Sequence, residues 1–102
     1  MDYPEPAVSE TVVNDLWYRT KNAKLLAVIT VEATLYHRYS YLFRTQKGNY
    51  FFQIDERHGD GTFWQSTITP CDLGRAVYAY QHEAQYRTVD WNKAFPEPIV
   101  DA

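Results

Sequence analysis

The chain has 102 residues, with ten basic and thirteen acidic side chains that leave a net charge of −3. This length is that of one ordinary domain, and hydrophobic and aromatic contents of 45% and 17% exclude global disorder. The small net charge excludes both a polyanion mimic and a strongly basic nucleic-acid clamp. Because Cys71 is the single cysteine, no intramolecular disulfide or thiolate metal cluster can form, which favours a reducing compartment.

The N-terminal region carries no targeting signal. Residues 1–10 lack the basic start and the apolar run of a signal peptide. The longest purely apolar stretch, residues 25–29, has five residues, whereas a bilayer requires roughly 20. We therefore expect a cytoplasmic protein without a membrane-spanning segment.

Prolines mark both ends of the predicted domain. Two prolines flank a glutamate in residues 4–6 and again in residues 96–98, where neither a helix nor strand pairing continues easily. These features predict an extended N-terminal tail over residues 1–14, an α+β domain over residues 15–84 and an irregular C-terminal tail over residues 85–102.

Residues 24–36 are rich in β-branched side chains and predict a long strand. With a period of two, one face of this strand collects Leu25, Ala27, Ile29, Val31, Ala33 and Leu35. A helix is the alternative, since an apolar stripe with helical spacing also runs through the segment. That stripe consists of Leu25, Leu26, Ile29, Ala33 and Tyr36.

The next two elements form the clearest hairpin signal. Residues 39–45 and 49–55 are aromatic-rich runs joined by a short segment that contains Gly48, which is typical of a β-hairpin. Gly59 and Gly61 then interrupt the chain before an alternating run over residues 62–68. This run predicts the next strand of the same sheet.

A helix is predicted over residues 70–84. Thr69 can cap its N-terminus, and Pro70 suits its first position. Asp72, three residues after the cap, can accept a hydrogen bond from the Thr69 amide in return. Its apolar stripe consists of Leu73, Ala76, Val77, Tyr80 and Ala84. The predicted fold is therefore α+β, with an antiparallel sheet of four or five strands and one helix packed on one face. The core expected under the helix consists of Leu42, Phe52, Ile54, Trp64, Ile68, Leu73, Val77 and Tyr80.

The hairpin and the helix start carry a family resemblance. Residues 41–52 place an aromatic-Arg-Thr run before Gly48 and a Tyr-Phe pair, and residues 68–70 read Ile-Thr-Pro. This pattern, over residues 41–80, resembles small uncharacterised proteins encoded on bacterial plasmids and phages. The resemblance implies a bacterial or mobile-element origin and a non-enzymatic, partner-binding role.

The aromatic residues of the hairpin give the leading functional hypothesis. Tyr39, Tyr41 and Phe43 share one strand face, and Phe51 extends the aromatic surface on the next strand. One helix covers only one face of a sheet, so the chain's own tails, a second protomer or a partner must cover the other. We expect a non-catalytic protein-binding module, an inhibitor or adaptor, that binds a protein partner or forms a homodimer through this face or an exposed strand edge. If the tails cover the face instead, Trp17, Trp91, Phe95 and the N-terminal segment are the residues expected to fold over it.

Two other function classes stay open at this stage. The loop of residues 55–60 holds Asp55, His58 and Asp60, weak candidates for a metal site because the loop lacks a dedicated ligand spacing. With Cys71 near a helix start, the loop would also suit a small metal- or thiol-dependent enzyme. Arginines near the aromatics would suit a single-stranded nucleic-acid binder, although the negative net charge argues against nucleic acid. We expect no catalytic set, no bound metal and no cofactor.

Overall fold

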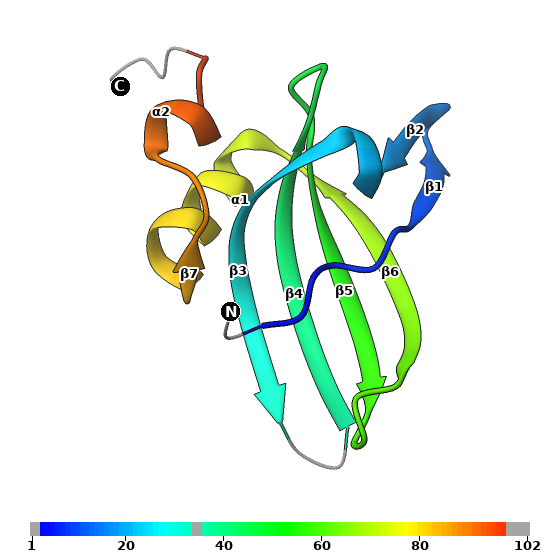
Figure 1. Cartoon of the computed structure of the whole chain (residues 1–102). Helices are drawn as coiled ribbons and strands as arrows, with labels where there is room; N and C mark the ends of the chain where they lie inside the picture. Colours follow the sequence, from blue (N-terminus) through cyan, green and yellow to red (C-terminus); the bar gives the residue numbers. More distant parts are fainter. Residues whose placement is uncertain (1–2, 34–35, 98–102) are drawn as a thin grey trace.

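A computed structural model describes residues 3–33 and 36–97 of the chain (Figure 1). It has the predicted α+β class: a five-stranded antiparallel sheet, a separate two-stranded sheet, and a short helical segment packed against the larger sheet. The elements in chain order are β1 (Glu10–Val13), β2 (Leu16–Arg19), a 3-10 turn (Thr20–Asn22), β3 (Ala23–Ala33), β4 (Tyr36–Thr45), β5 (Tyr50–His58), β6 (Phe63–Cys71), α1 (Leu73–Tyr78), a π-helical turn (Ala79–Glu83), β7 (Tyr86–Arg87) and α2 (Trp91–Ala94). No helix of the described residues is long and apolar enough to span a membrane.

The β4–β5 hairpin forms where the sequence predicts it. The larger sheet has the order β6-β5-β4-β3-β7, so this hairpin occupies its centre. The Thr45 carbonyl accepts a hydrogen bond from the Gly48 amide at 3.0 Å, and the Thr45 amide donates to the Asn49 carbonyl at 2.7 Å. Gly48 has a φ of 87°, a left-handed conformation that glycine adopts without steric cost. The turn therefore fixes the register of the two central strands.

The strand predicted over residues 24–36 is present as β3, and the helical alternative is wrong. However, its side chains do not alternate as predicted, because the register with β4 shifts between Leu25 and Ala27 and again between Val28 and Thr30. Leu26 and Ala27 consequently pack on the helix side of the sheet, whereas Leu25 and Val28 pack on the other side. Leu35 of the predicted face lies outside the described residues. The two bulges thus change which residues of β3 face each core.

The helix begins later than predicted. β6 continues through Pro70 and Cys71, and α1 starts at Leu73 with Asp72 as its N-cap. The Asp72 carboxylate accepts a hydrogen bond from the Arg75 amide at 2.8 Å, as an N-cap side chain should. Pro70 is tolerated in a strand because β6 is an edge of the sheet, where a missing N–H need not break the ladder. After Tyr78 the helix widens into the π-helical turn, which ends at Glu83.

One apolar core lies between the sheet and the helical segments. Its buried side chains include Leu26, Leu42, Tyr50, Tyr80 and Phe95. Of the core predicted here, Leu42 and Tyr80 are buried, and Phe52 and Val77 pack against the cluster. The other four members differ from that prediction: Trp64 is exposed, Leu73 is exposed at the helix start, Ile68 packs on the opposite side of the sheet, and Ile54 is half-buried and belongs to neither buried cluster. Leu73 is the first residue of α1 and precedes the buried Ala76 by about one turn, so it lies at the margin of this core.

Both predicted tails contain ordered elements among the described residues. Residues 3–9, which we call the N-terminal strap, cross the front of the sheet (Figure 1) and lead into the β1–β2 hairpin. Asn14 and Asp15 form the turn of this hairpin, with φ values of 52° and 66°, the left-handed pair that a tight two-residue hairpin requires. The C-terminal tail contributes β7, which pairs with β3, and the short helix α2.

Candidate functional site

The structure buries the aromatic face that the sequence predicts as a binding surface. Tyr41 and Phe51 are fully buried, Phe43 is 3% exposed, and Tyr39 is half-buried at the margin. Phe43 and Phe51 stack with ring centroids 5.0 Å apart, and Tyr18 of the β1–β2 hairpin packs edge-on against Phe51. The chain therefore covers this face with its own N-terminal residues. The predicted set is brought together as a second core rather than as an open surface.

Asp55 holds the strap to the sheet. Its carboxylate is fully buried and accepts three hydrogen bonds: from the Ala7 amide at 2.7 Å, from the Gln53 amide group at 2.9 Å and from the Ser66 hydroxyl at 2.6 Å. A buried carboxylate that lost these donors would carry a large desolvation cost. This candidate metal ligand is therefore a structural anchor for the N-terminal strap.

Two further side chains of the sheet bond the strap. The fully buried Gln53 donates to the Ala7 carbonyl at 2.7 Å, and its own carbonyl accepts from the Thr20 hydroxyl. The Tyr41 hydroxyl donates to the Pro4 carbonyl at 2.9 Å. Burial, together with the nearby Asp55 carboxylate, raises the pKa of Tyr41 well above its usual value, so its hydroxyl remains a donor. The strap is thus fixed by named side chains as well as by apolar contact.

The other two metal candidates lie apart from Asp55. Asp60 accepts hydrogen bonds from the amide and hydroxyl of Thr62, and these bonds lower the pKa of its carboxyl group. The His58 ring stacks on Trp64 at 5.7 Å between centroids. Among the described residues, no group of three His, Cys, Asp or Glu side chains could hold a metal ion. The predicted loop of residues 55–60 is wrong in part, because residues 55–58 belong to β5 and the turn between β5 and β6 covers residues 59–62.

Cys71 lies at the end of β6, half-buried against the helix-side core. Burial raises the pKa of its thiol to about 11, the Asp72 carboxylate contributes to the increase, and Arg75 partly opposes it. At neutral pH the group is a protonated thiol rather than the thiolate that nucleophilic chemistry needs. Cys71 directly precedes Asp72, the N-cap of α1, so it lies near a helix start as the sequence predicts, but as the last residue of β6.

The open edge of β6 is a surface that the sequence did not locate. β6 pairs with β5 on one side, and no described strand pairs with its other side. Its nine residues, FWQSTITPC, contain no charged side chain. Natural edge strands are usually short, charged or covered, because an open edge invites pairing with another chain. Pro70 lacks a main-chain donor at one end of this edge, and β1 contacts β6 without pairing with it.

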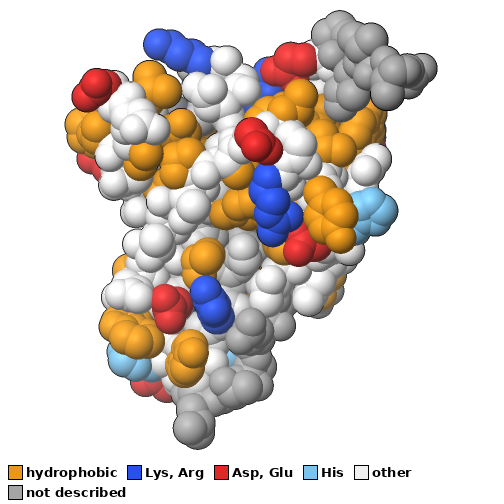
Figure 2. All heavy atoms as spheres, turned by 180° about the vertical axis from the view of Figure 1, so that it is seen from behind, with side chains coloured by type: hydrophobic (Ala, Val, Ile, Leu, Met, Phe, Trp, Pro, Cys, Tyr) orange, Lys and Arg blue, Asp and Glu red, His pale blue; other side chains and the backbone are white. Residues whose placement is uncertain are grey.

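Exposed aromatic rings surround the start of this edge. Phe63 is 46% exposed and Trp64 is 51% exposed. The Tyr36 ring packs edge-on against Trp64 at 6.2 Å between centroids, and the Arg57 guanidinium lies 5.8 Å above the Phe63 ring. Figure 2 shows hydrophobic side chains and a histidine gathered at this lower end of the molecule, where β5 turns into β6.

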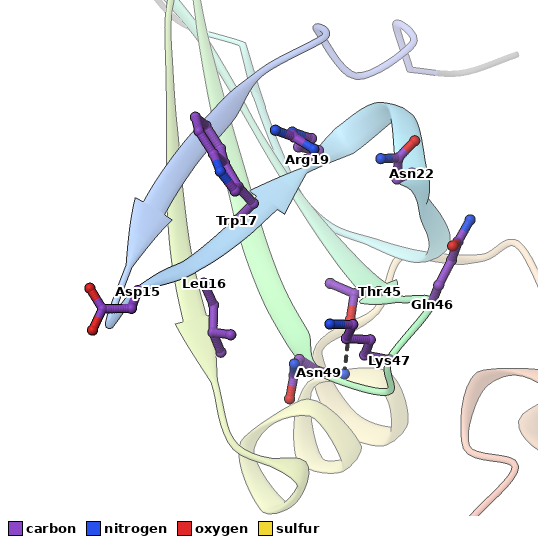
Figure 3. A pocket seen from close by; sticks show the side chains of 9 residues that line it. All are labelled: Asp15, Leu16, Trp17, Arg19, Asn22, Thr45, Gln46, Lys47 and Asn49. Atoms are coloured by element: carbon purple, nitrogen blue, oxygen red, sulfur yellow. Dashed lines mark hydrogen bonds between the residues drawn. The ribbon is translucent and has the colours of Figure 1, made fainter.

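A pocket of about 370 Å³ lies at the opposite end of the sheet, between the β1–β2 hairpin and the β4–β5 turn (Figure 3). We call it the hairpin pocket. Leu16, Trp17 and Arg19 line it from β2, and Lys47 and Asn49 line it from the turn. The Trp17 ring is 55% exposed and carries the Arg19 guanidinium 4.4 Å above it. The sequence analysis names Trp17 among the residues that would cover the aromatic face. In the structure it lines an open pocket instead.

A second pocket, of about 470 Å³, adjoins the first. It is lined by Lys21, Lys24, Arg44 and Lys93, and we call it the lysine pocket. The two pockets share the lining residues Asn22, Thr45 and Gln46. Arg44 forms an ion pair with Glu97, which raises the pKa of the guanidinium and lowers that of the carboxyl group. In sequence these cations are dispersed, so only the sheet register and the C-terminal segment could have revealed the cluster.

Comparisons with protein-family models, curated proteins and solved structures gave no match to this chain.

Proposed function

We propose that the protein is a non-catalytic protein-binding module that pairs an extended segment of its partner with the open edge of β6. The observation that carries this proposal is the uncharged, nine-residue edge strand. An added strand gains main-chain hydrogen bonds from the edge and specificity from side-chain pockets beside it. An inhibitor or adaptor acts in this way, because it occupies a surface without performing chemistry.

The ladder directs free main-chain groups outward along this edge. Hydrogen-bonded pairs alternate in an antiparallel sheet, and Thr45 and Asn49 form such a pair at the start of the β4–β5 ladder. In the register of β5 with β6, this alternation leaves the main-chain groups of Ser66 and Ile68 pointing away from β5. Pro70 occupies the next outward position, so an added strand would pair most strongly between residues 64 and 69.

The exposed aromatics beside the edge support a protein as the ligand. Phe63 and Trp64 lie at one end of the pairing segment, and aromatic side chains supply much of the binding energy at protein interfaces. The non-catalytic part of the proposal is supported by the protonated Cys71 thiol and by the placement of Asp55 under the strap, apart from His58 and Asp60. The aromatic residues that the sequence predicts as a binding surface, Tyr39, Tyr41, Phe43 and Phe51, belong to the core beneath the strap.

Selection of extended peptides from a random display library tests the proposal. The full chain is the bait, and each selected peptide is then measured against the wild type and against the Thr67→Lys/Thr69→Lys variant. Lysines on an edge strand oppose strand addition, so affinity should fall by roughly tenfold or more, about 1.4 kcal/mol. The matched control is Gln85→Lys beside the two-residue strand β7, which should bind as the wild type does.

Amide exchange locates the bound peptide. Protection of the Ser66 and Ile68 amides on peptide binding is expected, while amides of β7 should not change. If the selected peptides bind both variants equally, or protect amides elsewhere, the edge is not the binding surface. Light scattering on the purified chain distinguishes a second copy from another partner, since a homodimer through β6 should become monomeric in the Thr67→Lys/Thr69→Lys variant.

A further inference from the structure

All four lysines of the chain lie at one end of the sheet. Lys21, Lys24 and Lys93 line the lysine pocket, and Lys47 lines the adjoining hairpin pocket. None of the four forms an ion pair with a described residue, although the chain has more acidic than basic side chains. Of the described carboxylates at this end, Glu10 and Glu97 pair with arginines, and Asp15 lines the hairpin pocket.

The sheet register brings two of the cations face to face. Lys24 on β3 lies directly opposite Arg44 on β4, and like charges in directly opposed positions destabilise a sheet. Glu97 neutralises Arg44 alone, which leaves Lys24 beside Lys21 and Lys93 without a counter-charge in the pocket. An anion bound between them would relieve this repulsion.

The local charge differs in sign from that of the whole chain. Among the described residues around the two pockets, six basic side chains are accompanied by three carboxylates, those of Glu10, Asp15 and Glu97, which gives these residues a net charge of +3 in a chain of −3. At physiological salt, charges farther away than about 8 Å are largely screened. The average charge, which argues against nucleic acid, therefore does not describe this end of the molecule.

An aromatic wall accompanies the cations. Trp17 is 55% exposed and Arg19 stacks on it at 4.4 Å, and the hairpin pocket that they line adjoins the lysine pocket, with which it shares three lining residues. A ligand that spans both pockets must combine a flat ring with negative charge. Exposed indole and guanidinium groups stack on bases, and lysines neutralise phosphates.

We propose that these two pockets form a binding site for nucleotide units, with the base against Trp17 and the phosphate among Lys21, Lys24 and Lys93. Free nucleotides and single-stranded nucleic acid share this chemistry, and the site suits both. An acidic peptide would pair with the lysines but would leave the Trp17 ring unused. The site lies at the opposite end of the sheet from the aromatics beside β6, so it does not depend on the proposed protein-binding function.

Fluorescence anisotropy with a 5′-labelled oligothymidylate tests this site, with adenosine monophosphate and polyglutamate as competitors. The wild type should bind the oligonucleotide with an affinity that falls with salt, with a log–log slope of roughly −2 to −3 for three or four neutralised phosphates. Competition by the mononucleotide would identify a free nucleotide as a sufficient ligand, and its failure would identify the strand as the ligand. Both results agree with the proposal.

Variants assign the binding to these residues. Lys24→Glu/Lys93→Glu should weaken binding by roughly tenfold or more, and Trp17→Ala should weaken it by roughly fivefold to a hundredfold through lost stacking. Arg38→Glu, six residues along β4 from Arg44 and outside both pockets, is the matched control and should bind as the wild type does. Thermal unfolding confirms that each variant is folded.

Three results would overturn the proposal: no binding of the oligonucleotide at low salt, an equal loss in Arg38→Glu and Lys24→Glu/Lys93→Glu, or full competition by polyglutamate with no effect of Trp17→Ala. The last result would identify an acidic peptide as the ligand. Because the Thr67→Lys/Thr69→Lys variant should retain nucleotide binding, failure at this site and failure at the β6 edge are distinguishable.

Discussion

The two faces of the larger sheet are covered by different means. On one face, α1, the π-helical turn and α2 cover the sheet, and the buried cluster there is mainly aliphatic and aromatic side chains. On the other face the cover is the irregular N-terminal strap with the β1–β2 hairpin, and the buried cluster is aromatic. Among the described residues, the fully buried polar side chains Gln53 and Asp55 lie on this second face.

Main-chain hydrogen bonding explains the difference. A helix satisfies its interior amides and carbonyls, so the sheet beneath it needs to offer few polar partners, and on this face the Tyr50 hydroxyl donates to the Ala94 carbonyl at 3.3 Å. An irregular segment cannot do so, and its buried main-chain groups must find partners elsewhere. Here the sheet supplies them, since Asp55 and Gln53 bond both main-chain groups of Ala7, and Tyr41 bonds the carbonyl of Pro4. The sheet therefore carries buried polar residues on β5 because an irregular strap covers this face.

The largest effect is expected from removing an aromatic ring under the strap. Phe51→Ala should lower the free energy of unfolding by about 3–5 kcal/mol, because a fully buried ring leaves a cavity. Leu42→Ala, equally buried on the helix side, is the matched variant and should cost about 2–5 kcal/mol. Urea unfolding measures both. A loss of less than about 1 kcal/mol for Phe51→Ala would mean that the strap face is not a core.

The next largest effect should come from the anchor of the strap. Asp55→Ala removes the acceptor of three hydrogen bonds and should cost about 2 kcal/mol, because buried donors lose their partner. The neighbouring Glu56→Ala, whose side chain bonds only the exposed Gln65, should change stability by less than about 0.5 kcal/mol. The Ala7 amide should also exchange faster with solvent in Asp55→Ala. Equal stabilities of the two variants would contradict the anchoring role.

A smaller effect should come from the helix side. Asp72→Ala removes the N-cap of α1 and should cost about 1 kcal/mol in a thermal or urea unfolding experiment. Asp90 occupies the equivalent position before α2 but makes no capping hydrogen bond. Asp90→Ala should therefore have less effect than Asp72→Ala, and the reverse order would show that the observed helix start is wrong.

The smallest effect should come from the outer side of the β1–β2 hairpin. Trp17→Ala should lower the free energy of unfolding by only about 0.5 kcal/mol, which is typical of an exposed cation–π contact such as that between Trp17 and Arg19. Tyr18, the next residue on β2, is 7% exposed and packs on Phe51. Tyr18→Ala should therefore destabilise the protein far more than Trp17→Ala does. Similar unfolding midpoints for the two variants would contradict the difference in burial between the two rings.

Local patterns predicted the elements of the fold better than their boundaries. The glycine turn between β4 and β5 and the β-branched run of β3 are short-range signals, and both elements form. The two bulges of β3 are shifts in its register with β4, so the pattern of apolar residues within β3 alone does not reveal them. Likewise, Pro70 looks like the start of a helix until the sheet order makes β6 an edge.

The candidate sites were harder to predict, because each depends on contacts distant in sequence. The aromatic residues of β4 and β5 were correctly predicted to gather on one face, but their cover depends on hydrogen bonds that join residues 46 and 48 positions apart. The sequence makes Asp55 a candidate metal ligand only because its neighbours in sequence are also polar. The lysine pocket assembles four cations from separate parts of the chain, and no short motif in the sequence records that arrangement.

The central claim is that the chain's own N-terminal strap covers the aromatic face. A nuclear Overhauser experiment on a mixture of isotope-labelled and unlabelled chains tests it most directly. Contacts between the rings of Tyr3 and Tyr41, 6.4 Å apart, and of Tyr3 and Tyr86, 5.4 Å apart, should appear within one chain. Absence of these contacts, with random-coil shifts over residues 3–9, or their appearance only between labelled and unlabelled chains, would contradict the account.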